Sequence, residues 1–358
     1  MRRAALAQSA ERVLGKDEVG GSSPLSSSNF NAPERLSGLF HCIFRLRLKK
    51  MADTIKIGIP NALLYHRYRT FWRLFFESLG CEVIVSGPTT QETLRQGSAL
   101  AIDEACLSLK IFLGHVSELI GKCDCIFIPR INNYGRGRDV CPRYAALYDI
   151  TCNAFRGSGQ RFLTCSIDGI AGETEEKALK SVILQMGFNE RQAKEAYALA
   201  KKAYEKEKKA AEKAQNELLK KDGLKILIAA HSYVIDDAYI GKGIEDYLRK
   251  NNATVIRADI IDHEEGRKLS RKLSPTCRWE LSREIIGGIE KYRNSVDGII
   301  LVSTFPCGSD AMVNELLMRR LKNIPILSLV LDGQTGTAGL ETRLESFLDI
   351  IDFKEAAK

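Results

Sequence analysis

The sequence lacks the features that would identify several common classes of protein. No apolar run approaches the roughly 18 residues that a membrane-spanning helix requires, so we expect a soluble, cytoplasmic protein. There is no secretory signal, so the ten cysteines do not indicate a disulfide framework. The Gly-x-x-x-x-Gly-Lys-Ser/Thr loop of ATP-binding proteins is missing, and no order of Ser, His and Asp typical of a hydrolase stands out.

The net charge of +8 gives little support to nucleic-acid binding once its location is considered. Residues 1–50 hold nine of the 53 Lys and Arg but only four of the 45 Asp and Glu, so the rest of the chain is nearly neutral. The same 50 residues are rich in Ser, Gly and Arg and show no sustained helix or strand period. We therefore expect residues 1–50 to be a disordered leader, with Met51 as the true start.

From Met51 onward, short apolar runs alternate with helical patterns, which predicts an α/β protein with two lobes, each built on a mainly parallel sheet. The first lobe is expected over residues 51–172 and the second over residues 223–358. Residues 173–222 are highly charged and rich in alanine, which predicts connecting helices with one break near residues 187–189. Strands are expected over residues 55–59, 81–85, 124–128, 161–166, 225–229, 254–257, 298–302 and 324–330.

Three cysteines occupy similar places in this pattern, each in a turn that leads into a helix. The apolar run at residues 298–302 ends in a Pro/Cys/Gly turn, and Cys307 in that turn precedes a helical pattern. Cys106 and Cys141 are arranged in the same way, and Pro142 suits the first position of a helix. A helix N-terminus stabilises a thiolate. Three such thiolates would suit an iron–sulfur cluster, because the ligand is soft and anionic.

Two other interpretations of the cysteines stay open on the residues alone. Zinc is a weaker candidate, because Cys-x-x-Cys pairs are missing and three ligands spread over two lobes are unusual for structural zinc. All ten cysteines could instead be small core residues or surface thiols. Cys152 and Cys277 could be auxiliary ligands. Burial is the better interpretation for the four cysteines in strand-like runs, which are Cys81, Cys123, Cys125 and Cys165.

Several short motifs occur in order between residues 55 and 353. They include Asp-Glu-Ala-Cys-Leu-Ser-Leu-Lys at 103–110, Ile-Phe-Ile-Pro-Arg at 126–130, Cys-Pro-Arg-Tyr at 141–144, His-Ser-Tyr-Val-Ile-Asp at 231–236 and Phe-Pro-Cys-Gly-Ser-Asp at 305–310. Each motif alone is weak, but their order and number make the set fairly specific. With them, the chain resembles the acyl-CoA dehydratase activase-related branch of the 2-hydroxyacyl-CoA dehydratase superfamily.

The resemblance implies two flavodoxin-like, doubly wound lobes with a 4Fe-4S cluster between them. The family's dehydratases hold the cluster with three cysteines, and by motif position these would be Cys106, Cys141 and Cys307 here. The sequence departs from the family in two places. Ser309 stands where a proline is expected, and Gln334 and its neighbours stand where relatives often carry an acidic residue and a histidine. The second departure weakens any inference about chemistry near residue 335.

The resemblance implies three alternative functions. In the first, the protein takes electrons from an ATP-dependent activase-type partner and passes them on, as part of anaerobic metabolism. In the second, the chain is a dehydratase (lyase) subunit whose open iron binds a 2-hydroxyacyl-CoA. In the third, it is a non-catalytic regulatory subunit. A single pair of lobes without an evident CoA motif favours the redox function, while an acyl-CoA ligand stays possible. We expect neither nucleic acid nor a membrane as a partner.

Other polar residues in or near the motifs could assist a cluster or bind an acidic ligand. His115 and His231 could donate protons near the cluster, although a lone histidine is more often structural. Glu104, Lys110 and Asp310 flank the proposed ligands and could tune the charge of the cluster. Four arginines would suit an acidic ligand such as the phosphates of coenzyme A, although a solvated loop explains them as well; they are Arg130, Arg136, Arg138 and Arg143.

Overall fold

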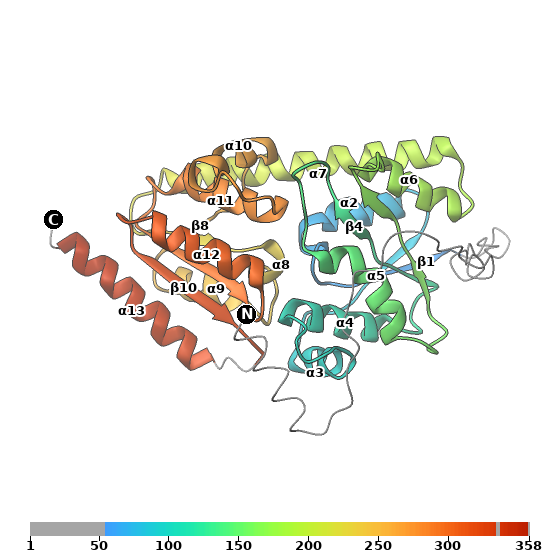
Figure 1. Ribbon diagram of the computed structural model, residues 1–358, viewed down its shortest axis with the longest axis horizontal. Coiled ribbons are helices and arrows are strands. Elements are labelled where there is room, and N and C mark those ends of the chain that lie inside the picture. The colour runs from blue at the N-terminus through green and yellow to red at the C-terminus, as the bar shows by residue number, and fades with distance from the viewer. Residues whose placement is uncertain (1–53, 334–336, 357–358) are drawn as a thin grey trace, which may run out of the picture. The chain divides into compact units, whose positions relative to one another are not determined.

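The computed structural model describes residues 54–333 and 337–356, so the predicted leader and Gln334 lie outside the described residues. The architecture is α/β, with two separate four-stranded parallel sheets (Figure 1). The prediction of two flavodoxin-like lobes joined by long charged helices is confirmed at the level of fold class. The residue boundaries of the two lobes stay a prediction. Within the described residues, no helix is long and apolar enough to cross a membrane.

The first sheet has the strand order β2-β1-β3-β5, and every neighbouring pair is parallel. The four strands predicted in this part of the chain are confirmed as β1 (Lys56–Ile59), β2 (Glu82–Val85), β3 (Cys125–Phe127) and β5 (Arg161–Leu163). A further two-stranded sheet, which the sequence did not predict, pairs β4 (Arg130–Asn133) with β6 (Ser166–Asp168). The helices here are α2 (Tyr65–Glu77), α3 (Gln91–Leu100), α4 (Leu107–Leu119) and α5 (Pro142–Ala154).

Helix α2 explains why this sheet has a well-packed face. Its aromatic residues recur at helical spacing and all six are buried, which puts them in the core of the first lobe. Trp72 and Phe76 contact Phe127 of β3 edge to face, with ring centroids 5.5 and 5.1 Å apart. Phe71 of the same helix packs edge to face against Tyr197 and Tyr204. The aromatic stripe is therefore core, and it also joins α2 to a helix far along the chain.

The second sheet repeats the plan with the order β10-β9-β7-β8, again entirely parallel. All seven residues of the central strand β9 are buried, as a continuous apolar run in a parallel sheet requires. The predicted strands are confirmed as β7 (Lys225–Ala229), β8 (Thr254–Arg257), β9 (Gly298–Thr304) and β10 (Ile326–Leu331). The helices are α8 (Ser232–Ile235), α9 (Lys242–Lys250), α10 (His263–Leu273), α11 (Glu280–Tyr292), α12 (Gly308–Arg320) and α13 (Thr337–Ala356).

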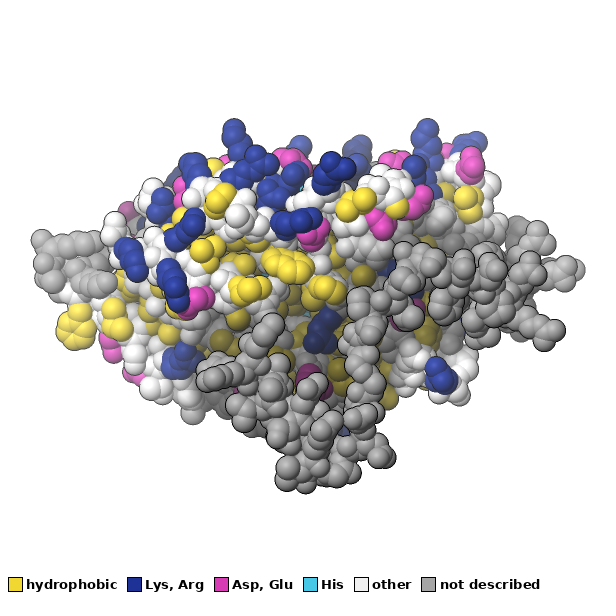
Figure 2. All heavy atoms as spheres, viewed as in Figure 1, with side chains coloured by type: hydrophobic (Ala, Val, Ile, Leu, Met, Phe, Trp, Pro, Cys, Tyr) yellow, Lys and Arg dark blue, Asp and Glu magenta, His cyan; other side chains and the backbone are white. Residues whose placement is uncertain are grey.

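The connecting helices are α6 (Glu175–Gln185) and α7 (Glu190–Leu219), with the break where the sequence predicts it. Asn189 caps α7 by accepting a hydrogen bond from the backbone N–H of Gln192, in a capping box. Helix α7 runs unbroken for 30 residues (Figure 1). Lys and Arg side chains gather on the surface above it (Figure 2), as expected of a solvated face. Near its C-terminus, Gln215 is buried and bonds the backbone of Arg257 at the end of β8.

Candidate functional site

The three predicted cysteines line one cavity of about 230 Å³. Each is half-buried and is the N-cap residue of a helix: Cys106 precedes α4, Cys141 precedes α5 and Cys307 precedes α12. Pro142 occupies the first turn of α5, where its missing N–H costs nothing. None of the three side chains caps its own helix, so no sulfur is committed to a helix-capping hydrogen bond. The structure thus brings together three cysteines that are up to 201 residues apart in the sequence.

Direct hydrogen bonds hold the Cys106 segment against the Cys307 segment. The backbone N–H of Leu107 donates to the carbonyl of Phe305 at 3.0 Å. The hydroxyls of Ser108 and Thr304 lie 3.3 Å apart, and both side chains are buried. Because Leu107 follows Cys106 directly and Phe305 lies two residues before Cys307, these bonds fix the approach of the two cysteines.

The Cys141 segment is tied to the second lobe in the same manner. Asp139 accepts a hydrogen bond from the backbone N–H of Glu280 at 2.8 Å and donates its own N–H to the carbonyl of Arg278 at 3.0 Å. Arg138 adds an ion pair to the buried carboxylate of Glu280, with Nε 2.7 Å from Oε1. These contacts of Arg138 and Asp139 with the second lobe hold the neighbouring Cys141 at the cavity.

The protonation of the cysteines differs from the sequence-based expectation. Burial, assisted by the nearby Asp310 carboxylate, raises the pKa of Cys307 to about 12. Burial likewise raises the pKa of Cys141. At these two positions desolvation outweighs the stabilisation that a helix N-terminus gives a thiolate. Both are thus thiols at neutral pH, and a bound metal would have to displace their protons.

A buried polar pair lies beside Cys307. His231 Nε2 and Asp310 Oδ1 are 3.0 Å apart, and both residues are buried. Burial opposes both charges, but the pairing with Asp310 raises the pKa of His231, and the pairing with His231 lowers the pKa of Asp310. The ring of Tyr233 stacks on His231 at a centroid distance of 5.0 Å. His231 is thus at the cavity, as the sequence suggested, but it is already held by a carboxylate.

His115 lies elsewhere and does not line the cysteine cavity. It is fully buried on α4, and its Nε2 is 2.9 Å from the hydroxyl of Thr89. Thr89 in turn donates to Asp237 at 2.5 Å. The structural interpretation of His115 is therefore the better one.

The arginines proposed for an acidic ligand do not converge on the cysteines. Arg143 alone of the four lines the cavity, and it donates to the carbonyl of Glu104 at 3.2 Å. Arg130 pairs with Asp149 at 2.7 Å, and Arg138 is held by Glu280. Lys110 donates to the carbonyl of Asp103 at 3.0 Å, on the exposed side of its helix.

The other cysteines are distributed as burial predicts. Cys81, Cys125 and Cys165 are buried, and Cys123 is half-buried with its sulfur close to where a side chain on Gly58 would be. Cys152 and Cys277 are half-buried and do not line the cysteine cavity.

Two tyrosines and a tryptophan at the cavity were not predicted to belong to it. They are Tyr144, Tyr233 and Trp279. The tyrosines stand inside the motifs Cys-Pro-Arg-Tyr and His-Ser-Tyr, so the motifs carried the signal. Trp279 lies in none of the motifs. It lines the cavity because its backbone forms a bridge with that of Asp139, a contact between distant segments that the sequence does not reveal.

Among the described residues, the three cysteines do not form a ready-made site for a single metal ion. Within residues 54–333 and 337–356, no group of three or more His, Cys, Asp or Glu side chains is close enough to hold one ion. This argues against zinc, whose four ligands must meet at one centre. A cubane binds each thiolate through a different iron, so it accepts cysteines that are farther apart. Besides the three cysteines, Arg143, His231 and Glu280 line the cavity, so ionisable side chains of both signs share it with the sulfurs.

Comparison with known families adds an independent observation. Residues 56–261, more than half of the chain, match the family described as CoA enzyme activase uncharacterised domain. A search of curated proteins found no match. The matched segment includes Cys106 and Cys141 and ends before Cys307. The grouping of Cys307 with these two cysteines is therefore supported only by the order of the motifs and by the shared cavity.

Proposed function

The chain belongs to the family of the CoA enzyme activase uncharacterised domain, and we propose that it is an iron–sulfur redox protein. In this proposal Cys106, Cys141 and Cys307 hold a 4Fe-4S cluster. The protein takes electrons from an ATP-dependent activase-type partner and passes them to a substrate or a second protein. One observation carries the proposal: three half-buried cysteines, each at the start of a helix, line one cavity.

The residues around the cavity would each contribute something to holding such a group. When bound, a 4Fe-4S cluster would supply one-electron redox chemistry. The first turns of α4, α5 and α12 direct backbone N–H groups toward the cysteine ends, which favours a negatively charged guest. Tyr144 and Tyr233 line the cavity, where Tyr144 is buried and Tyr233 is half-buried. The His231–Asp310 pair keeps a fixed polar group next to Cys307.

The size of the cavity favours the redox function over the dehydratase function. At about 230 Å³, it is smaller than the roughly 300–1,000 Å³ typical of sites for drug-sized ligands. An acyl-CoA is larger still, so a lyase would require the two lobes to open. A compact cluster needs no such movement.

Anaerobic purification of the full chain, followed by iron and sulfide assays and electron paramagnetic resonance of the dithionite-reduced protein, tests the proposal. We expect close to four iron and four sulfide per chain and a signal from a reduced cluster. Cys307→Ala should lose most of the iron and the signal. Cys152→Ala is the matched control, because Cys152 is half-buried on α5 and does not line the cavity. Cys81→Ala is a second control, since Cys81 is buried in the core.

Two outcomes would contradict the proposal. Wild-type protein that binds no iron under anaerobic conditions would remove the cluster altogether. A Cys307→Ala variant with the iron content of Cys152→Ala would remove Cys307 from the ligand set and leave the proposed cluster without a cysteine ligand from the second lobe.

A further inference from the structure

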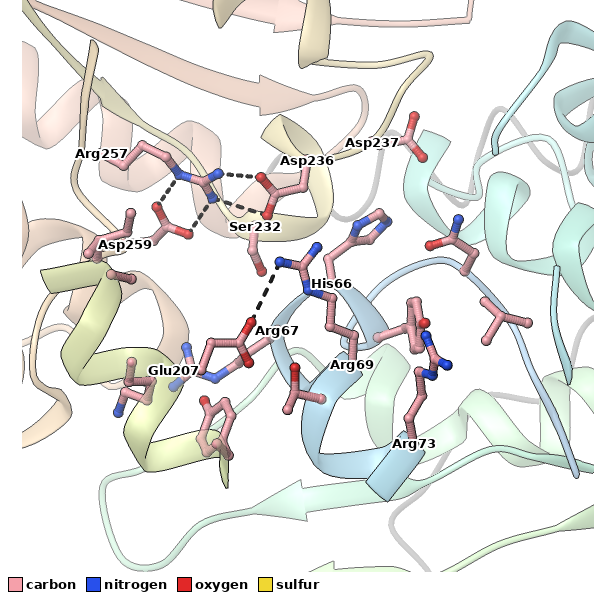
Figure 3. Close-up of a pocket in the computed structure, with 18 of the residues that line it drawn as sticks. His66, Arg67, Arg69, Arg73, Glu207, Ser232, Asp236, Asp237, Arg257 and Asp259 are labelled. Atoms are coloured by element: carbon pink, nitrogen blue, oxygen red, sulfur yellow. Dashed lines mark hydrogen bonds and ion pairs between the residues drawn. The ribbon is translucent and has the colours of Figure 1, made fainter. Parts of the chain in front are cut away.

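A second and much larger cavity opens between the two lobes, with a volume of about 1,050 Å³ (Figure 3). It shares no lining residue with the cysteine cavity. Its walls come from α2, from α7 and from the segments that follow several strands. Nothing in the proposed redox function uses this space.

The cavity lies where parallel sheets place their ligands. Asn61 follows β1, Thr89 follows β2, Ser232 follows β7 and Asp259 follows β8, and all four line the cavity. Ligands of open α/β sheets bind beyond the carboxyl ends of the strands. Here the carboxyl ends of two strands from each sheet face the same space.

One wall of the cavity presents carboxylates that are held in place. Asp236 and Asp259 both pair with the guanidinium of Arg257, which is mostly buried (Figure 3). Asp237 is 1% exposed and accepts hydrogen bonds from the hydroxyl of Thr89 and from the backbone N–H of Tyr239. Fixed carboxylates of this kind accept hydrogen bonds from the hydroxyl groups of a ligand, as the acidic residue in dinucleotide-binding folds does for ribose.

The opposite wall is basic and comes from one face of α2. His66, Arg69 and Arg73 are spaced three and four residues apart, so they share that face, and they extend from α2 in Figure 3. Arg69 pairs with Glu207 of α7 at 3.6 Å, and Arg73 with Glu77 at 3.3 Å. Both arginines are more than half exposed, and exposed pairs of this geometry contribute little. A phosphate could therefore replace either glutamate as their partner at little cost.

His66 places a neutral polar ring at the edge of this wall. Its Nε2 is shielded from solvent and has no hydrogen-bond partner within the described part of the chain. Buried polar atoms are normally hydrogen-bonded. Burial also lowers the pKa of His66, so the ring is neutral at pH 7 and its free nitrogen can accept or donate one hydrogen bond.

From these two walls we infer that the cavity binds a phosphorylated small molecule that carries hydroxyl groups. The phosphate lies against Arg69 and Arg73 on α2. The hydroxyl groups face Asp236 and Asp259 across the cavity. The inference does not depend on the cluster, because the two cavities have separate walls.

Isothermal titration calorimetry of the full chain with ribose 5-phosphate and with inorganic phosphate tests both halves of the site. We expect saturable binding of both probes, with ribose 5-phosphate at least about tenfold tighter because it adds hydrogen bonds to the aspartates. The double variant Arg69→Gln/Arg73→Gln should bind both probes at least about tenfold more weakly. Arg191→Gln is the matched control, since Arg191 is an exposed α7 arginine in an i,i+4 pair with Glu195.

Each alternative outcome contradicts a defined part of the inference. No saturable binding of either probe by the wild type overturns the site. Equal affinity for the two probes overturns the hydroxyl-binding wall, and equal affinity of the double variant and Arg191→Gln overturns the phosphate-binding wall. Should the double variant misfold, hydrogen exchange of wild-type α2 amides with and without ribose 5-phosphate replaces it, and unchanged protection overturns the inference. Cys307→Ala should bind ribose 5-phosphate like the wild type.

Discussion

A half-buried histidine gives a quantitative test of how α10 is held against α11 in the second lobe. His263 lies between two buried carboxylates of α11: Nε2 is 2.8 Å from Glu280, and Nδ1 bonds Glu284. Two further groups face it, Arg138 with Nη2 2.6 Å from Nε2, and the exposed Glu264 at 3.9 Å. Although burial lowers it and Arg138 opposes the imidazolium, the hydrogen bonds to the two carboxylates raise the pKa of His263 to about 9.

The raised pKa sets both the size and the sign of the effect. A change from 6.5 to about 9 corresponds to about 3 kcal/mol of folding free energy. Because the folded protein holds the proton more tightly than the unfolded chain, this stabilisation is fully present below pH 6.5. It is lost as the pH rises through 9.

Urea unfolding of the wild type and of His263→Gln at pH 6 and at pH 10 measures this contribution. Glutamine can keep a hydrogen bond to one carboxylate but carries no charge. We expect the wild type to be more stable than the variant at pH 6, and this advantage to shrink by about 3 kcal/mol at pH 10. Buried thiols and tyrosines also titrate in this range, but they are common to both proteins and cancel in the difference. An advantage that stays constant between pH 6 and pH 10 would refute the reasoning.

Two further predictions concern the packing of α3 against α4 and the hydrogen bonds of Gln215. Gly114→Ala should destabilise the protein by at least about 2 kcal/mol in thermal unfolding, because the new Cβ would lie 1.9 Å from the carbonyl oxygen of Thr93 where α3 meets α4. Gly243→Ala on α9, where nothing lies within 4 Å of the new Cβ, should be neutral or stabilising by up to about 1 kcal/mol, and an equal loss in both variants would contradict this packing. Gln215→Ala should cost about 1–3 kcal/mol in urea unfolding, because the backbone N–H of Arg257 loses the acceptor that Gln215 provides and the carbonyl of Arg257 loses a donor. Lys213→Ala, an exposed substitution on the same helix, should change the free energy of unfolding by less than about 0.5 kcal/mol. An equal loss of stability in the two variants would show that the hydrogen bonds of Gln215 do not stabilise the fold.

The sequence was a good guide wherever one element buries an apolar face on its own. The strands of both main sheets contain short apolar runs, because a strand covered on both faces buries successive side chains, as the central strand β9 does. The break near residues 187–189 was predicted too, because it depends on a local interaction, the capping of α7 by Asn189.

The elements that the sequence missed are those that depend on a distant partner. Helix α10 is mostly charged, and it packs on α11 through the close approach of Gly266 to Gly287, which no local period reveals. Strand β4 carries Arg and Asn and is a strand only because β6 lies beside it. Helices α3 and α8 are short, and their patterns do not separate them from loops.

For the cysteines, the sequence by itself determined that Cys106, Cys141 and Cys307 each stand directly before a helix, because proline, glycine and apolar periodicity act over a few residues. The tertiary structure decided that they share a cavity, through the bonds from Leu107 to Phe305 and from Asp139 to Glu280. It also decided the protonation of Cys307, because the desolvation that raises its pKa comes from both lobes closing around it. Helix starts are local, whereas burial and the meeting of distant segments belong to the whole fold.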